Sequence, residues 1–194
     1  AEAGYLNFVG LEIAIAPDGS RFVYPGGPSR DKAEFIVQER DQLTGRIIPG
    51  MTNAFSPVFS PDGRRIAFRD QRFGSLKVIP LDGSTPTTLL DSLSGFMNGG
   101  LAWGRDGYIY APGMQGVRGI LYRIPETGGA PEPVTSADTA NGTLGHITPV
   151  VLPGGRGIVY TEWHGPTRGN DNWIVAWDLK NRRALRLLQG LQAW

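Results

Sequence analysis

The chain contains no cysteine and only two histidines, and both facts narrow the chemistry that it can perform. Without cysteine there can be no disulfides, no thiolate metal sites and no cysteine nucleophile. The histidines, His146 and His164, lie 18 residues apart and lack the close spacing of a zinc-binding pair. We therefore expect neither a metal ion nor a cofactor.

Long apolar runs and an excess of one charge are also missing. No apolar run approaches the roughly 18 residues of a membrane-spanning helix, so we expect no membrane insertion by this segment. The opening AEAGYLNFVG lacks the basic and apolar regions of a signal peptide, although a signal or anchor could lie outside this chain. The formal net charge is +1, so no nucleic-acid partner is expected.

Glycine and proline, by contrast, are abundant. They number 28 and 15 among 194 residues, which is roughly twice their average usage. They stand singly or in pairs between apolar runs, and no segment of about 11 or more residues shows the helical period of 3.6. This distribution is typical of many turns between many short strands.

One turn phrase recurs along the chain. It reads APDGSRFVY at 16–24, SPDGRRIAF at 60–68, GRDGYIY at 104–110 and LPGGRGIVY at 152–160. The last glycines of these turns are Gly19, Gly63, Gly107 and Gly155, at spacings of 44, 44 and 48 residues. Proline and aspartate favour a tight turn, glycine accepts the left-handed backbone that closes it, and the apolar triplet that follows favours a strand. The third copy has two residues fewer between its glycine and its triplet YIY.

A third and a fourth strand complete each period. The third strands read EFIVQER at 34–40, SLKVIPL at 75–81, GILYRIP at 119–125 and NWIVAWDL at 172–179. Four short antiparallel strands in about 44 residues are typical of one β-propeller blade. A β-sandwich is the alternative, but it does not explain why one phrase returns every four strands.

We therefore predict an all-β fold, a β-propeller arc of about four four-stranded antiparallel blades. The expected bounds are about 8–51, 55–91, 99–136 and 146–189. The closing GLQAW at 190–194 is similar to GLAW at 100–103, which opens the third repeat, so we expect it to begin a further blade. The arc would then be a fragment of a six- or seven-bladed propeller, and its open blade edges could allow self-association.

The repeat resembles a known family. SPDGRRIAF followed by SLKVIPLDGS resembles the PD40 (WD40-like) repeat of TolB-type propellers. The order of phrases across nearly the whole chain also resembles the C-terminal propeller of bacterial receptor-type Ser/Thr protein kinases. That resemblance implies a location outside the bacterial cytoplasm, for example in the periplasm. The chain itself lacks the glycine-rich loop, HRD and DFG motifs of a kinase and the G-x-S-x-G motif of a peptidase, so we expect no catalytic activity in this part.

Propeller geometry indicates where a binding site would lie. Turns between first and second strands share one rim, so Asp18, Asp62 and Asp106 are interpreted as turn formers. The opposite rim carries the second-to-third and fourth-to-first connections, which do not repeat. The candidate binding residues there are Arg69, Arg72, Trp163, His164, Arg168, Asp171 and His146. A solvated loop with Trp163 packed at a blade edge remains the alternative, and Trp103, Trp173 and Trp177 are expected between blades.

Three functions are compatible with these features. The first is a non-catalytic propeller that binds a protein, a peptide or a small ligand in an envelope or receptor-kinase protein. The second is a propeller that gates substrate access to a prolyl-oligopeptidase-like peptidase. The third is a TolB-like periplasmic interaction protein. The sequence of the neighbouring domains would discriminate among them.

Overall fold

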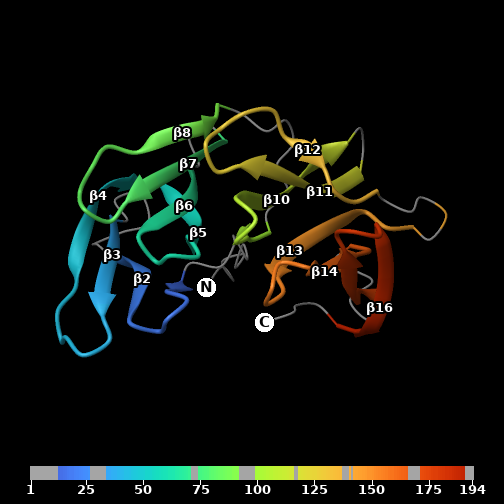
Figure 1. Ribbon diagram of the computed structural model, residues 1–194, viewed down its shortest axis with the longest axis horizontal. Coiled ribbons are helices and arrows are strands. Elements are labelled where there is room, and N and C mark those ends of the chain that lie inside the picture. Colours follow the sequence, from blue (N-terminus) through green and yellow to red (C-terminus); the bar gives the residue numbers. More distant parts are fainter. Residues whose placement is uncertain are drawn as a thin grey trace, which may run out of the picture.

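The computed structural model describes residues 13–26, 34–70, 74–91, 99–115, 118–136, 140, 142–165 and 171–190. These residues form sixteen strands in four separate four-stranded sheets. Among them there is no helix long and apolar enough to cross a membrane. Figure 1 shows the sheets following one another along an arc, from β2–β4 on the left, over the top, to β13–β16 on the right.

Each sheet is one blade, and its strands pair antiparallel in chain order. Blade 1 contains β1 (Ala14–Ile15), β2 (Arg21–Gly26), β3 (Glu34–Glu39) and β4 (Arg46–Thr52). Blade 2 contains β5 (Ala54–Phe59), β6 (Arg65–Asp70), β7 (Ser75–Pro80) and β8 (Thr87–Leu90). Blade 3 contains β9 (Ala102–Trp103), β10 (Tyr108–Gln115), β11 (Arg118–Pro125) and β12 (Glu132–Pro133). Blade 4 contains β13 (Gly145–Val151), β14 (Gly157–Trp163), β15 (Trp173–Asp178) and β16 (Arg183–Gln189). The predicted arc of four four-stranded blades is confirmed.

Apolar side chains fill the space between successive blades. Three buried clusters lie between blades 1 and 2, blades 2 and 3, and blades 3 and 4. Trp103 is buried in the second cluster, and Trp173 and Trp177 pack against the third, as predicted for the strand tryptophans. Large flat side chains suit this position because they cover much apolar area between two stacked sheets.

The repeated phrase forms the turn between the first and second strands. Gly19, Gly63, Gly107 and Gly155 all have positive φ angles, between 67° and 82°. Asp18 accepts hydrogen bonds from the amide and the hydroxyl of Ser20, and these hold the pKa of its carboxyl group below the usual value. Such aspartates therefore serve the backbone of the turn.

A second repeated feature lies seven residues before three of these turn glycines. Ser56, Gly100 and Thr148 have positive φ angles of 51°, 41° and 51°. The strand pairing shifts at the same place in blades 2 and 4, between Phe55 and Val58 and between Ile147 and Val150. Left-handed backbone at a non-glycine residue is unfavourable. Its recurrence at the same place makes this β-bulge on the first strand a regular structural feature of the blades.

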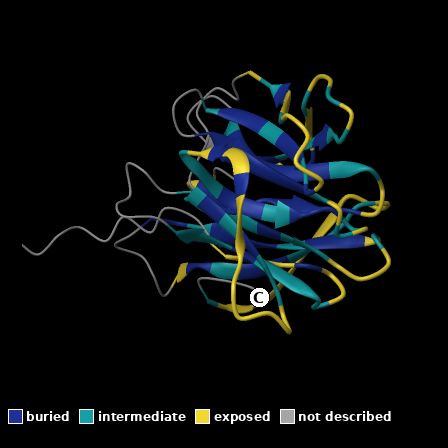
Figure 2. Cartoon of the chain, turned by 90° about the vertical axis from the view of Figure 1, so that its left-hand side faces the viewer, coloured by how far each residue is buried: buried dark blue, intermediate teal, exposed yellow. Residues whose placement is uncertain are grey.

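Antiparallel order puts alternate connections at opposite ends of each blade. We call the end with the β1–β2, β5–β6 and β13–β14 turns the turn rim, and the end at which β2, β6, β10 and β14 finish the loop rim. Figure 2 shows many exposed turns gathered at one end of the sheets, on its right-hand side. The loop rim carries the connections that do not repeat.

Candidate binding face

Five of the seven predicted site residues lie within the described part of the chain, and all five lie at the loop rim. They are Arg69 near the end of β6, His146 near the start of β13, Trp163 at the end of β14, His164 after it, and Asp171 just before β15. Arg72 and Arg168 lie outside the described residues. Arg69, His146 and His164 are buried, Trp163 is half-buried and Asp171 is exposed.

Arg69 joins blade 2 to blade 3. Its side chain is buried, and Nη2 donates a hydrogen bond to the carbonyl oxygen of Pro112 on β10 at 3.1 Å. The guanidinium carbon lies 5.5 Å from the ring centre of Phe55, the residue opposite Arg69 on β5. Burial lowers the pKa of Arg69 to about 9. This cation therefore helps to support the rim from within and is not presented to a partner.

His146 joins blade 3 to blade 4 in a similar way. Its Nδ1 atom lies 2.7 Å from Oγ1 of Thr135, which also accepts the amide of Leu121. Its ring centre lies 4.6 Å from that of Tyr160. Burial lowers the pKa of His146 to about 4, although the nearby Glu162 acts in the opposite direction. The ring is therefore neutral at pH 7.

Glu162 is the centre of a charged cluster in blade 4. Its carboxylate accepts hydrogen bonds from Nε and Nη2 of Arg186 at 3.0 and 2.7 Å, and from Oγ1 of Thr143 at 2.8 Å. Burial acts to raise the pKa of Glu162, but the bonds from Arg186 and Thr143 outweigh it and the pKa lies below the usual value. Arg186 also lies over the ring of Trp173 at 5.4 Å.

The connection between β14 and β15 is fixed at both ends. At its start, the amide of His164 donates to Oδ1 of Asn172 at 2.8 Å, and Leu144 donates to the carbonyl oxygen of Trp163. At its end, the amide of Gly190 donates to the carbonyl oxygen of Asn172. Trp163 and Asp171 therefore lie at the two ends of one connection, and hydrogen bonds anchor both ends to blade 4.

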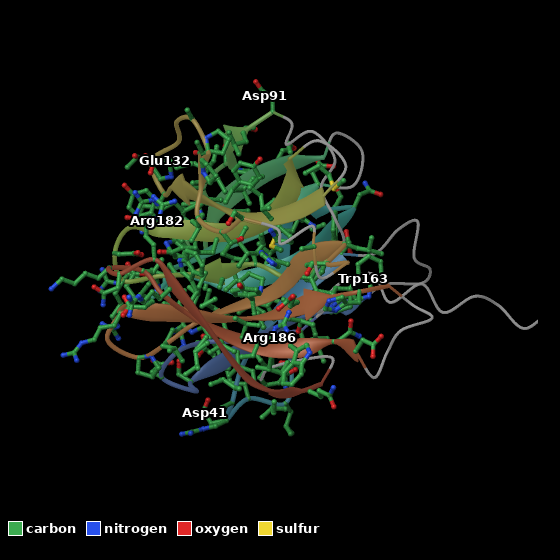
Figure 3. All side chains as sticks on the ribbon, turned by 90° about the vertical axis from the view of Figure 1, so that its right-hand side faces the viewer. Asp41, Asp91, Glu132, Trp163, Arg182 and Arg186 are labelled. Carbon is green, nitrogen blue, oxygen red and sulfur yellow. The ribbon has the colours of Figure 1, made fainter. Side chains whose placement is uncertain are left out.

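Figure 3 shows how the labelled side chains lie across blade 4. Trp163 lies on one side of the blade, and Arg182, in the β15–β16 turn, lies on the opposite side. Asp178, the last residue of β15, accepts hydrogen bonds from the amides of Lys180 and Asn181, so it stabilises that turn. The two rims thus differ: carboxylates of the repeated phrase stabilise turns at one, and the buried carboxylates of Asp70 and Glu162 pair with cations at the other.

Two acids at this rim were not among the predicted site residues. Asp70 on β6 and Glu162 on β14 hold equivalent positions, two residues after the aromatic side chain that ends the triplets IAF and IVY. Each pairs with a cation from another strand of its blade, Lys77 at 2.6 Å and Arg186 at 2.7 Å. The shared pattern of aromatic, any residue, acid was the signal that could have identified them. Among the described residues there is no group of three side chains placed to hold a metal ion.

Comparison with known proteins supports the fold and leaves the family open. No protein-family model and no curated protein matches the chain. Among solved structures, it is similar to TolB from Acinetobacter baumannii, with a TM-score of 0.75, 17% identity and coverage of 92% of this chain and 43% of that one. It is also similar to a putative TolB from Agrobacterium tumefaciens, with a TM-score of 0.76, 18% identity and coverage of 93% and 67%.

A third similar structure is a puromycin-hydrolyzing peptidase from Mycobacterium tuberculosis, with a TM-score of 0.64 and 17% identity. The match covers 92% of this chain and 29% of that one. The chain thus spans 43% of the first TolB structure, and its fold is that of a TolB-type β-propeller arc.

Proposed function

We propose that this arc is a non-catalytic binding module that recognises a peptide or protein segment at the loop rim, beside Trp163. The observation that carries the proposal is the anchoring of the β14–β15 connection by Asn172, Leu144 and Gly190. A rigid scaffold that holds a non-repeating loop is the usual setting for recognition. Tryptophan is also a frequent anchor of binding energy at protein interfaces.

The charged cluster supports the same reading. Arg186 keeps 39% of its side chain exposed while it pairs with the buried Glu162 and covers Trp173. A guanidinium held by a carboxylate and an aromatic ring loses little conformational freedom when a partner binds. Arg186 and Asp171 thus place one positive and one negative group near the β14–β15 connection.

The sequence resemblance extends the proposal to the parent protein. We propose that the module serves outside the cytoplasm of a bacterium, either in a receptor-type kinase or in a TolB-like interaction protein. The similarity to TolB structures supports a propeller that works without catalysis. Only the sequence phrases that resemble the kinase propellers support a receptor-type kinase as the parent protein. The coding sequence on either side of this chain tests that proposal.

The binding proposal is tested by selecting peptides from a displayed random library on the immobilised chain and measuring their affinity by fluorescence polarisation. We expect Trp163→Ala to weaken the selected peptides by at least about tenfold. Leu43→Ala is the matched control, because Leu43 is 99% exposed in the β3–β4 turn on the opposite rim. Peptides that bind both variants as well as the unchanged chain would place the site elsewhere.

A second candidate is the gating propeller of a peptidase. Its support is the match to 29% of the Mycobacterium tuberculosis peptidase and to 30% of a prolyl endopeptidase. In that role the arc would belong to a longer chain with a G-x-S-x-G hydrolase domain. Joining the arc to such a domain should change hydrolysis of long peptides more than hydrolysis of a dipeptide substrate. Equal effects on both would reject gating.

A further inference from the structure

The turn rim of blade 4 carries an excess of positive charge. Its two turns, β13–β14 and β15–β16, lie side by side, because the amide of Leu179 donates a hydrogen bond to the carbonyl oxygen of Arg156 at 3.2 Å. Four cations lie in these turns or directly after them, and all four are exposed. We call them the basic patch: Arg156, Lys180, Arg182 and Arg183.

Asp178 is the one acid beside the basic patch, and the turn already uses its carboxylate. Oδ1 accepts hydrogen bonds from the amides of Asn181 and Lys180, and Oδ2 accepts one from Nδ2 of Asn181. The bonds from Asn181 hold the pKa of Asp178 below the usual value. In the part of the chain that the structure describes, no ion pair joins a cation of the patch to an acid.

The turn rims of the other blades lack such an excess. Cations and acids are equal in number in the turns of blade 1 (16–21 and 39–46) and of blade 2 (60–65 and 80–87), and acids exceed cations by one in those of blade 3 (104–107 and 123–132). Ion pairs also use cations at this rim, namely Arg21 with Glu39, Arg65 with Glu126, and Arg123 with Glu132. Within the arc, the positive excess is therefore confined to blade 4.

The basic patch lies mainly in turns at the end of the sheet, whereas neighbouring blades stack on sheet faces. Blades 2 and 3 each have a blade on both sides, and Arg64 and Arg105 in their turns are nevertheless exposed. Figure 3 shows Arg182 at this end of blade 4, on the side away from Trp163. Stacking of another blade would therefore leave the turn residues of the patch open to a partner.

The surroundings of the patch indicate what kind of anion fits it. Leu152 stands in the same turn as Arg156 and is 37% exposed, so an apolar side chain accompanies the cations. An extended polyanion, such as a membrane surface or a nucleic acid, would reach over blade 3, where acids are in excess. A short acidic peptide would meet the cations and Leu152 alone.

We propose that the basic patch and Leu152 bind an acidic segment of a partner protein, with an apolar residue among its acids. Carboxylates can form paired hydrogen bonds with the exposed guanidinium groups, and the opposite charges speed the encounter. The apolar residue of the segment covers Leu152. This surface lies on the rim opposite Trp163, so it does not rest on the binding site proposed there.

The experiment is fluorescence anisotropy with a labelled peptide in which one leucine is flanked on each side by three glutamates, at about 50 mM salt. The chain should bind it saturably. Changing Arg156→Gln, Lys180→Gln and Arg182→Asn together should weaken binding at least about tenfold, because three ion pairs are lost. Asparagine is used at 182 because it tolerates the φ of 53°. Serine in place of the peptide leucine should weaken binding about threefold.

The matched control removes three exposed cations from the turn rims of the other blades, by Arg40→Gln, Arg64→Gln and Arg105→Gln. It has the same net charge as the first variant and should change the affinity by less than about twofold. The proposal is overturned if both variants lose affinity equally, or if the unchanged chain does not bind the peptide. It is also overturned if phosphatidylglycerol vesicles or duplex DNA bind the patch more tightly than the peptide. Circular dichroism confirms that each variant keeps its strands.

Discussion

Glu162 and Arg186 form an ion pair with two parallel hydrogen bonds, Nε to Oε2 at 3.0 Å and Nη2 to Oε1 at 2.7 Å. The pair links the second strand of blade 4 to its fourth strand, across β15. Only 8% of the Glu162 side chain is exposed, so the carboxylate depends on its partners for the solvation that water would provide. This geometry holds the outermost strand to the blade beside the candidate binding face.

Removing the cation should therefore destabilise the chain. We expect Arg186→Ala to lower the free energy of unfolding by about 2 kcal/mol, because a buried carboxylate loses its charged partner. Urea unfolding followed by circular dichroism measures the change. Arg123→Ala is the control: Arg123 also makes two hydrogen bonds to one carboxylate, that of Glu132, but both side chains are more than a third exposed. Its loss should stay below about 1 kcal/mol, and equal losses would contradict the role of burial.

Acid should weaken the contact between blades 3 and 4 through His146. Its pKa lies at about 4 in the folded chain and near 6.5 in the unfolded chain. A group with a depressed folded pKa contributes stability above its unfolded pKa and loses it as the pH falls toward the folded value. The loss at about pH 5 should reach about 2 kcal/mol relative to pH 7. Urea unfolding at the two pH values measures it.

The groups that face His146 allow this loss to be assigned. Glu162 and His164 are the charged or titratable groups that act on its pKa, and Tyr160 packs against its ring. His146→Asn keeps a polar side chain but cannot titrate, so its stability should change much less between pH 7 and about pH 5. Because the pKa of Glu162 is lowered, its own contribution falls only at more acidic pH. An unchanged pH dependence in His146→Asn would assign the loss to another group.

The repeat made the architecture predictable, but the register of blade 3 shows where the pattern stops. The repeat in the sequence aligns Tyr108–Tyr110 with Ile66–Phe68, which makes the segment between the turn glycine and the triplet two residues shorter in the third copy. The structure pairs Ile109 with Trp103 as it pairs Ile66 with Phe59, so the third copy is shorter by one residue. A shift of one residue exchanges the two faces of a strand. Both faces of β10 are apolar and buried, so no polar side chain marked the correct one.

The location of the candidate site could be predicted from the sequence, but the roles of its residues were harder to predict. The alternation of connections put the site residues at the loop rim, where the structure has them. Arg69 and His146 were predicted as binding residues, but both are buried, although arginine is seldom fully buried. Both side chains contact blade 3, at Pro112 and Thr135, and no local pattern encodes contacts of that kind.

The repeated bulge gives a last prediction, at Gly99. A Cβ atom at this position would lie 2.9 Å from Cβ of Ile147, closer than real Cβ contacts allow, so glycine lets blade 3 approach the bulge of blade 4. We expect Gly99→Ala to cost about 1–3 kcal/mol by overpacking, measured by urea unfolding. Gly19→Asn is the control, because nothing would lie within 4 Å of its Cβ and asparagine tolerates its φ of 69°. If Gly99→Ala were as stable as the unchanged chain, the close contact between the bulges would not contribute to blade packing.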